Sequence, residues 1–463
     1  MSPNLEFENG WSAGYSLRGK LRACVSFVGF MTLLAAGLAA QTTPPPAPAQ
    51  TPVVAYGSGV QTPLQFTGET APANQVLLSM GVATFYDDNV LQTNLNRQSD
   101  EALSFTSQLA AYRQTDRLKV DFEYTPFFVL YRQVDQLDRL NHNANLNAVL
   151  QLSSHVNVRL QDAFTYQNGL YQSLSGQQIL SGLGAPTALN ESLNPYAIRT
   201  LANTVRLDLT YAKSGRTSFG FTSGFDRRQF GNQQIPGESL YNSWGVDGGL
   251  QYQYRATEHT TVGLFAVHQD STFRGGQVFG QNLRFQSDSI FFSVSSRLSA
   301  TVTATVFGGP QDVRIMGQTS GTAGTSAQVE PAGGGSITWE VQKTALELSA
   351  QRIVTDGGGF YTLVKNTNLD FGVRRRLVGQ WQGSVHIDAA RANTSLFQLA
   401  SGTTDALIGV CGFYRPLGNA ATLHATYETV HQLSKGVLLF PSFDRNRITI
   451  GVDYRFRSIP LGR

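Results

Sequence analysis

The residues best suited to chemistry in this chain are charged side chains that recur at every second position. Residues 117–124 read Arg-Leu-Lys-Val-Asp-Phe-Glu-Tyr. Because successive side chains of an extended strand point to opposite faces, this segment places all its charges on one face. The charged face consists of Arg117, Lys119, Asp121 and Glu123. Opposed charges along one wall attract and filter hydrophilic solutes, so the segment indicates a transport or binding surface.

The same alternation gives a polar face to three later segments. Every second residue there is polar or charged, namely Asn141, Asn143, Asn145, Asn147, Arg159, Gln161, Arg206 and Asp208. Together with the first four, these are our candidate pore-lining residues. Two interpretations stay open, because the charges either filter solutes inside an aqueous channel or pair with one another across the wall.

Patterns typical of catalysis or metal binding are not found in the sequence. The seven His residues are scattered, with no His-Glu-x-x-His motif and no cysteine partner for a zinc site. The glycine clusters at 333–335 and 357–359 lack the Lys-Ser/Thr that follows in a phosphate-binding loop. We therefore predict no metal, no cofactor and no enzymatic activity. The alternative is a hydrolase whose Ser, His and Asp or Asn meet only in the fold, with Asn141 and His142 as the neighbours to inspect.

The apolar residues of the alternating segments predict what surrounds these strands. Opposite the charges of the first segment lie Leu118, Val120, Phe122 and Tyr124, so one face meets an apolar phase and the other meets water. From about residue 75 onward we expect about eighteen strands (16–18), joined alternately by short turns and long loops. The predicted fold class is all-β: a transmembrane antiparallel up-and-down β-barrel of the outer membrane, with short periplasmic turns and long outer loops. The longest predicted loops are 167–199 and 309–334.

Two soluble architectures fit the pattern less well. A β-sandwich also alternates, but it needs a second sheet to cover each apolar face. A β-solenoid would show a fixed short repeat, which the sequence lacks. One residue breaks the barrel pattern, since Asp162 falls on the apolar side of its strand. A carboxylate facing lipid is unfavourable, so we expect either a β-bulge that turns Asp162 away or a position near a membrane interface.

The N-terminal region predicts export. Basic residues precede an apolar run at 25–38, and small residues then offer cleavage after Ala39 or Ala40. We therefore expect a signal peptide at 1–40, a Pro-rich periplasmic tether at 41–74 and the outer-membrane barrel at 75–463. Cleavage removes Cys24 and leaves Cys411 alone, so no internal disulfide is expected.

Charge and resemblance complete the sequence-based expectations. Basic and acidic residues nearly balance at 35 against 32, which argues against nucleic acid as a partner. The stretch from Arg139 to Tyr171, with Arg-Leu-Asn-His-Asn-Ala-Asn-Leu leading to Val-Arg-Leu-Gln-Asp-Ala-Phe-Thr-Tyr, resembles poorly characterised bacterial outer-membrane β-barrel proteins, some associated with exopolysaccharide systems. The resemblance implies an outer-membrane location and passage of solute or polymer. As partners we expect outer-membrane lipid and the barrel assembly machinery.

Three functions follow from these patterns. The first is a porin-like channel that passes hydrophilic solutes passively through a polar lumen. The second is a barrel that exports or secretes exopolysaccharide. The third is a structural or adhesive barrel whose outer loops bind a ligand.

Overall fold

Long antiparallel strands make up nearly all of the chain that the computed structural model describes. The described residues are 74–168, 171–173, 191–193, 199–231, 241–274, 283–319, 322–357, 363–396, 400–436 and 442–461. The predicted signal peptide with its cleavage site at Ala39 or Ala40, the predicted tether up to residue 73 and most of the predicted loop 167–199 lie outside these residues. Among the described residues, no helix is long and apolar enough to cross a membrane.

The strands follow one another in hairpin order. The first half of the chain contributes β1 (Gln75–Asp87), β2 (Asp100–Gln114), β3 (Leu118–Tyr131), β4 (Arg139–Gln151), β5 (Val156–Asn168), β8 (Arg199–Ala212), β9 (Thr217–Phe230), β10 (Asn242–Arg255) and β11 (Thr260–Arg274). The second half contributes β12 (Leu283–Arg297), β13 (Val302–Thr319), β14 (Thr322–Val341), β15 (Thr344–Thr355), β16 (Leu363–Arg376), β17 (Gln382–Leu396), β18 (Ala400–Leu417), β19 (Ala421–Lys435) and β20 (Phe443–Arg455). Outside this series lie the short pair β6 (Tyr171–Ser173) and β7 (Glu191–Leu193), the 3-10 turn η1 (Asp135–Leu137) and β21 (Ile459–Pro460).

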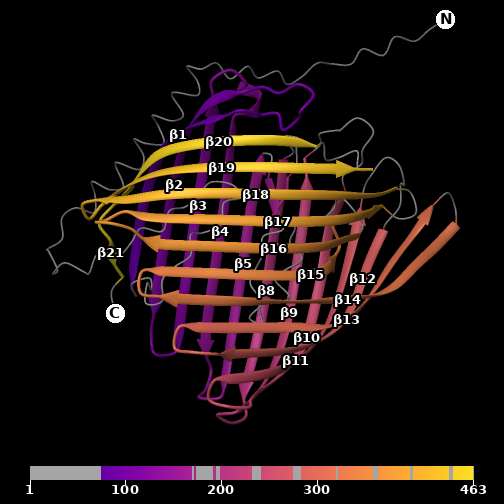
Figure 1. The fold of residues 1–463 in the computed structure, drawn as a ribbon. Helices are drawn as coiled ribbons and strands as arrows, with labels where there is room; N and C mark the ends of the chain where they lie inside the picture. The colour runs from indigo at the N-terminus through magenta and orange to yellow at the C-terminus, as the bar shows by residue number, and fades with distance from the viewer. Residues whose placement is uncertain are drawn as a thin grey trace, which may run out of the picture. The chain divides into compact units, whose positions relative to one another are not determined.

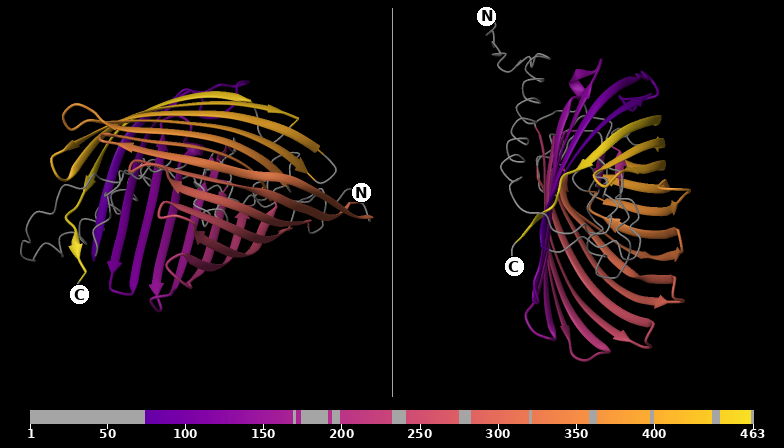
Figure 2. Two further views of the ribbon diagram at one scale, coloured as in Figure 1. Left: turned by 60° about the horizontal axis from the view of Figure 1, so that its bottom comes forward. Right: turned by 90° about the vertical axis from the view of Figure 1, so that its left-hand side faces the viewer.

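The sheet closes on itself. Each strand of the series pairs antiparallel with the next, and β1 pairs with β2 on one edge and with β20 on the other. The described residues therefore form a closed 18-strand antiparallel barrel, and β21 adds two residues beside the start of β1. In Figure 1 the indigo and magenta strands run across the orange and yellow ones, as tilted strands on opposite walls of a barrel do. Figure 2 shows the same walls turned, with β21 leaving next to β1. The predicted fold class is confirmed.

Hydroxyl side chains shape the short turns. At the β4–β5 turn, the backbone N–H groups of His155 and Val156 donate to the Ser153 hydroxyl at 3.2 and 3.1 Å. The same two-bond arrangement recurs at Ser214, Thr257 and Ser299. A Ser or Thr oxygen thus replaces backbone partners where the ladder ends. These turns define the short-turn end of the barrel, and the opposite end is called the loop end below.

The outside of the barrel is a belt of exposed apolar side chains. Its exposed members include Leu160, Leu207, Phe221, Leu250, Leu264, Ile290, Phe292, Val306, Phe413 and Ile450. Such a continuous apolar surface is unfavourable in water and matches the lipid-facing band of a membrane barrel. Toward the loop end the belt of β11–β13 gives way to outward ion pairs, such as His268 with Asp288 at 2.7 Å. These strands therefore project beyond the apolar band.

One predicted loop is a β-hairpin instead. Residues 309–319 belong to β13 and residues 322–334 to β14, and the two strands stay paired up to Thr319 and Thr322. Pro310 is tolerated because the ladder between β12 and β13 is interrupted there, between the pairs Ser289–Gln311 and Phe292–Gly308. Pro331 lies beyond Gly333, the last β14 residue paired with β15, so its missing N–H group is not needed. Pro310 and Pro331 therefore lie at unpaired edges of strands, whereas Gly333 and Gly334 are paired on both sides.

Candidate functional site

The predicted pore-lining residues come together on the inner face of β3, β4, β5 and β8. Register places them in rows that run across the wall. One row joins Asp121, Asn147, Gln161 and Arg206 through successive direct pairs. A second row joins Lys119, Val149, Arg159 and Asp208. A third row joins Glu123 and Asn145 to Ala163 and Thr204.

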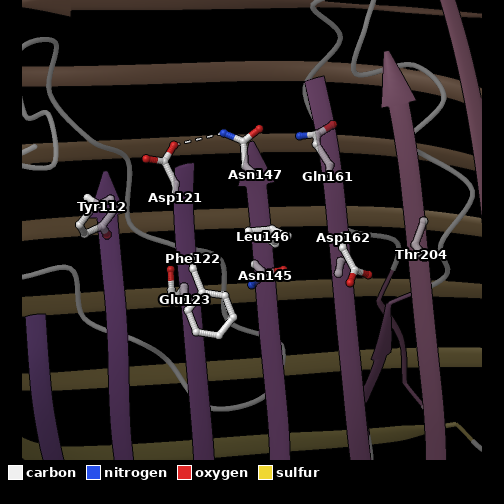
Figure 3. Close-up of a pocket in the computed structure, with 11 residues that line it drawn as sticks. Tyr112, Asp121, Phe122, Glu123, Asn145, Leu146, Asn147, Gln161, Asp162 and Thr204 are labelled. Carbon is white, nitrogen blue, oxygen red and sulfur yellow. Dashed lines mark hydrogen bonds between the residues drawn. The ribbon is translucent and has the colours of Figure 1, made fainter. Parts of the chain in front are cut away.

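These rows line a concave surface that encloses a volume of about 290 Å³. Figure 3 shows its lining residues on neighbouring strands, with Asp121 and Asn147 joined by a hydrogen bond. Five of the predicted residues line it: Asp121, Glu123, Asn145, Asn147 and Gln161. Tyr112 and Thr204 extend the lining onto β2 and β8. The surface therefore combines two carboxylates with amide groups that can donate and accept hydrogen bonds.

The two carboxylates are held by neighbours on the wall. Asn147 Nδ2 donates to Asp121 Oδ2 at 3.1 Å, and Lys119 Nζ lies 3.2 Å from the same oxygen. Gln108 Nε2 donates to Glu123 Oε1 at 2.7 Å. The Lys119 side chain is 55% exposed and that of Asp121 is 25% exposed. Pairing within the wall thus occurs, and it still leaves these charges accessible.

Arg206 anchors a second, more buried group on the same wall. Its Nη2 lies 3.3 Å from Asp247 Oδ2 and its Nε lies 3.1 Å from Thr222 Oγ1, and the residue is only 4% exposed. Thr222 in turn donates to Asp208 Oδ1 at 2.7 Å. Gly224 makes room for this group, because a Cβ there would come within 2.1 Å of Asp247 Oδ1.

Three predicted residues lie at the margins of this wall. Arg117 is exposed in the turn just before β3, so its side chain belongs to the rim. Asn141 is buried at 2% exposure and pairs with Phe127 near the loop end. Asn143 lies between Thr125 and Thr165, one step beyond the concave surface toward the loop end.

A second group of inner-face charges was not predicted from the sequence. It lies on β15, β16 and β17 and consists of Glu347, Asp370, His386 and Asp388. Asp370 pairs directly with Asp388, and both are at least nine-tenths buried. His386 Nε2 lies 3.0 Å from Asp370 Oδ2. The alternation of His386 and Asp388 with Val385, Ile387 and Ala389 carries the signal that could have revealed them. No group of His, Cys, Asp and Glu in the described chain has the arrangement of a metal site.

The inner face of β11–β13 holds three buried aromatic rings among buried serine, threonine and glutamine side chains. Phe265, Phe291 and Phe307 face inward, and each is 3% exposed. The rings of Phe291 and Phe307 meet edge to face with centroids 5.9 Å apart. This sector of the barrel interior is packed with side chains, in contrast to the exposed polar groups of β3–β5.

Asp162 stays on the outer face, contrary to one of the two expectations. It remains in register with Leu146 on β4 and Val205 on β8, so the predicted β-bulge is wrong. It is also the seventh residue of the 13-residue β5, halfway along the strand. Asn203 Nδ2 donates to Asp162 Oδ1 at 2.7 Å, which partly compensates for the loss of water. The hydrogen bond from Asn203 on the next strand thus stabilises Asp162 on the outer face, without a β-bulge that would turn its side chain inward.

Comparisons with known proteins find structural likeness only. No protein-family model and no curated protein matches the sequence. The ferric citrate transporter FecA in the unliganded form matches 83% of this chain and 64% of its own, at 12% identity and a TM-score of 0.47. The chain thus spans less than two thirds of that transporter. OccK5 (OpdH) from Pseudomonas aeruginosa matches 83% of this chain and 99% of its own, at 12% identity and a TM-score of 0.41. OccAB2 from Acinetobacter baumannii matches 82% and 98%, at 9% identity and a TM-score of 0.42.

The class of protein follows from the barrel itself. A closed sheet leaves no unpaired edge, an apolar belt surrounds it and polar groups are turned inward. Only such a sheet can cross a bilayer with its backbone hydrogen bonds satisfied. The chain is an outer-membrane β-barrel.

Proposed function

We propose that this protein is a porin-like channel for passive passage of hydrophilic solutes. The observation that carries the proposal is the inner face of β3, β4, β5 and β8, where rows of charged and amide side chains surround a concave surface of about 290 Å³. Barrels of sixteen to eighteen strands are wide enough to enclose an aqueous path, whereas barrels of about eight are filled by side chains. A polar, accessible wall in an 18-strand barrel supports such a path.

The wall also supports a proposal for how solutes are selected. Lys119 and Arg159 face the lumen beside Asp121, Glu123 and Asp208, so both signs of charge occur within a few residues of each other. Opposed charges create a transverse field, which favours dipolar and amide- or hydroxyl-rich solutes over simple ions of one sign. In our proposal the predicted residues on the wall of β3, β4, β5 and β8 act as this selective surface, apart from Arg117, Asn141 and Asn143 at its margins.

Liposome swelling and planar-bilayer recording test the function. We expect purified, refolded protein to produce stepwise conductance and to admit small uncharged sugars into liposomes. Substitution of both Asp121 and Glu123 by Asn and Gln removes two negative charges and is expected to shift the reversal potential in a salt gradient toward anions. Heat-modifiable gel migration would show that the protein is folded. If such protein gave no conductance and no swelling, a channel would be excluded and a barrel that binds a ligand through its outer loops would be favoured.

A further inference from the structure

A buried group of charged side chains lies at the loop end of the barrel interior, apart from the polar wall described above. Asp87 ends β1, Glu428 belongs to β19, Arg445 and Arg447 open β20, and Arg139 opens β4. Arg445 is 1% exposed and Arg139 is 3% exposed. Three buried guanidinium groups therefore lie at this end with the carboxylates of Asp87 and Glu428, while the buried Asp100 beside Asp87 accepts backbone N–H groups of residues 101, 133 and 134.

Both carboxylates are already bonded to an arginine. Arg447 donates through Nε and Nη2 to Asp87 Oδ2 at 3.2 and 3.0 Å, and Asp87 Oδ1 accepts the Asn89 N–H at 3.0 Å. The Arg447 guanidinium also lies over the Phe85 ring, 4.8 Å from its centroid. Glu428 Oε1 accepts from Arg445 Nη2. Arg445 and Arg447 thus each have a carboxylate partner.

Arg139 is left without a counter-charge. In the part of the chain that the structure describes, its guanidinium makes no hydrogen bond or ion pair, and its Nε is enclosed. An arginine stays charged at any physiological pH. A buried charge without a partner is strongly unfavourable, so the position calls for an anion that the residues described by the structure do not provide.

A second enclosed donor lies beside Arg139. The Tyr131 hydroxyl is buried and has no hydrogen-bond partner in the described structure. Arg139 pairs directly with Val129, which makes Tyr131 its diagonal neighbour on the same face of β3. Arg445 interacts electrostatically with both Tyr131 and Arg139. The Tyr131 hydroxyl and the Arg139 Nε are therefore neighbouring donors on one face, and both lack a hydrogen-bond acceptor in the described structure.

We propose that Arg139, Tyr131 and Arg445 form a binding site for an oxyanion, the carboxylate or phosphate group of a solute. A guanidinium offers parallel N–H donors to two oxygens of such a group, and a phenol adds a third donor. Chloride lacks the paired oxygens that this donor set fits. The proposal rests on the proposed function in one respect, since the solute would reach the site through the loop end of the channel.

Calorimetric titration of the whole refolded barrel in detergent tests the site without requiring conduction. The probes are sodium succinate and sodium phosphate, with sodium chloride as the reference. We expect one or both oxyanions to bind the wild type, and Arg139→Gln to weaken binding about tenfold or more, because charge-assisted hydrogen bonds are lost. Tyr131→Phe is expected to weaken it several-fold. Arg132→Gln is the matched control, because Arg132 is an exposed arginine at the same end, paired with Glu101 at 3.1 Å.

The outcomes separate clearly. Binding of succinate alone identifies a carboxylate site, and binding of phosphate alone identifies a phosphate site. The proposal is overturned if neither oxyanion binds the wild type more tightly than chloride does, or if Arg139→Gln binds as the wild type does. Should Arg139→Gln fail to fold, as judged by gel migration, Arg139→Lys and Tyr131→Phe provide the same test. If the protein conducts but binds no oxyanion, the binding site is rejected and the channel proposal stands. If it binds an oxyanion but does not conduct, the channel proposal is rejected and the binding site stands.

Discussion

Two walls of the barrel interior are built from opposite chemistry. On β3–β5 the inner side chains are amides and charges, and Lys119, Asn145 and Arg159 are exposed. On β11–β13 the inner side chains are buried, and three of them are phenylalanines with 3% exposure, two of which meet edge to face. Both walls carry the same apolar belt outside. The surrounding lipid thus requires apolar residues on the outer face of both walls. The inner face is not constrained in this way, and it forms a water-exposed polar surface on one wall and a packed core on the other.

The largest expected effect comes from removing a ring from the packed wall. Phe291→Ala deletes a buried ring in contact with Phe307, and we expect it to lower the free energy of unfolding by about 3–5 kcal/mol. Asn145→Ala on the polar wall is the matched control, and its effect is expected within about 0.5 kcal/mol. Urea unfolding in lipid vesicles measures both. Equal losses from the two variants would show that the walls do not differ in packing.

A charge placed on either face of a single strand compares lipid with lumen. Leu160 and Gln161 are neighbours on β5, the first 37% exposed on the belt and the second lining the concave surface. Leu160→Arg is expected to lower the free energy of unfolding by about 2–4 kcal/mol, because the charge must enter the bilayer. Gln161→Arg is expected to change it by less than about 0.5 kcal/mol. The same unfolding experiment would contradict the assignment of faces if Gln161→Arg were the more damaging change.

Adding a methyl group at Gly224 tests the ion pair between Arg206 and Asp247 on the polar wall. Gly224→Ala would bring a Cβ within 2.1 Å of Asp247 Oδ1, so the carboxylate must leave Arg206 or the strands must shift. We expect a loss of about 1–3 kcal/mol in the free energy of unfolding, together with a change in ion selectivity as Arg206 is uncovered. Gly215→Ala in a turn meets no atom within 4 Å and serves as the control. Unchanged stability and selectivity in Gly224→Ala would mean that this pair is unimportant.

The smallest expected effect concerns the carboxylate on the lipid side of the polar wall. Asp162→Leu removes the charge halfway along β5 and extends the belt, so we expect a gain of about 1 kcal/mol in the free energy of unfolding. Asp162→Asn keeps a polar neighbour for Asn203 and separates loss of charge from loss of the hydrogen bond. A clear loss of stability in Asp162→Leu would show that the pair with Asn203 stabilises the barrel despite its exposure to lipid.

The alternation of polar and apolar residues made the fold and the polar wall predictable. It could not predict the inner side chains of strands that are apolar on both faces, or contacts between distant strands. Lys119, Asp121 and Glu123 stand out because charges alternate with apolar residues over eight positions, and their placement on one face follows from backbone geometry alone. The packed wall has apolar residues on both faces of β11 and β12, so Phe265 and Phe291 carry no signal of facing inward. The converging arginines lie far apart in sequence, on β4 and β20, and only closure of the sheet brings Arg139 near Arg445.

Gly and Pro were misleading for a related reason. They interrupt strands in most sequences, yet a ladder that is already broken loses nothing when Pro310 or Pro331 enters it. A sequence pattern shows which residues cannot donate a hydrogen bond to a neighbouring strand. It does not show at which positions such a hydrogen bond is not needed. The extent of the β13–β14 hairpin therefore required the structure.

Cysteine accessibility tests most directly whether the wet path runs along the β3–β5 wall. In a variant with the exposed Cys411 replaced by Ala, single cysteines are placed at Asn145, at Ser293 on the packed wall and at Leu160 on the belt. A membrane-impermeant maleimide applied to the protein in vesicles is expected to label Asn145→Cys about tenfold faster than the other two, because thiol reactivity follows exposure to water. Labelling of Ser293→Cys as fast as Asn145→Cys, or protection of Asn145→Cys, would contradict a channel along this wall.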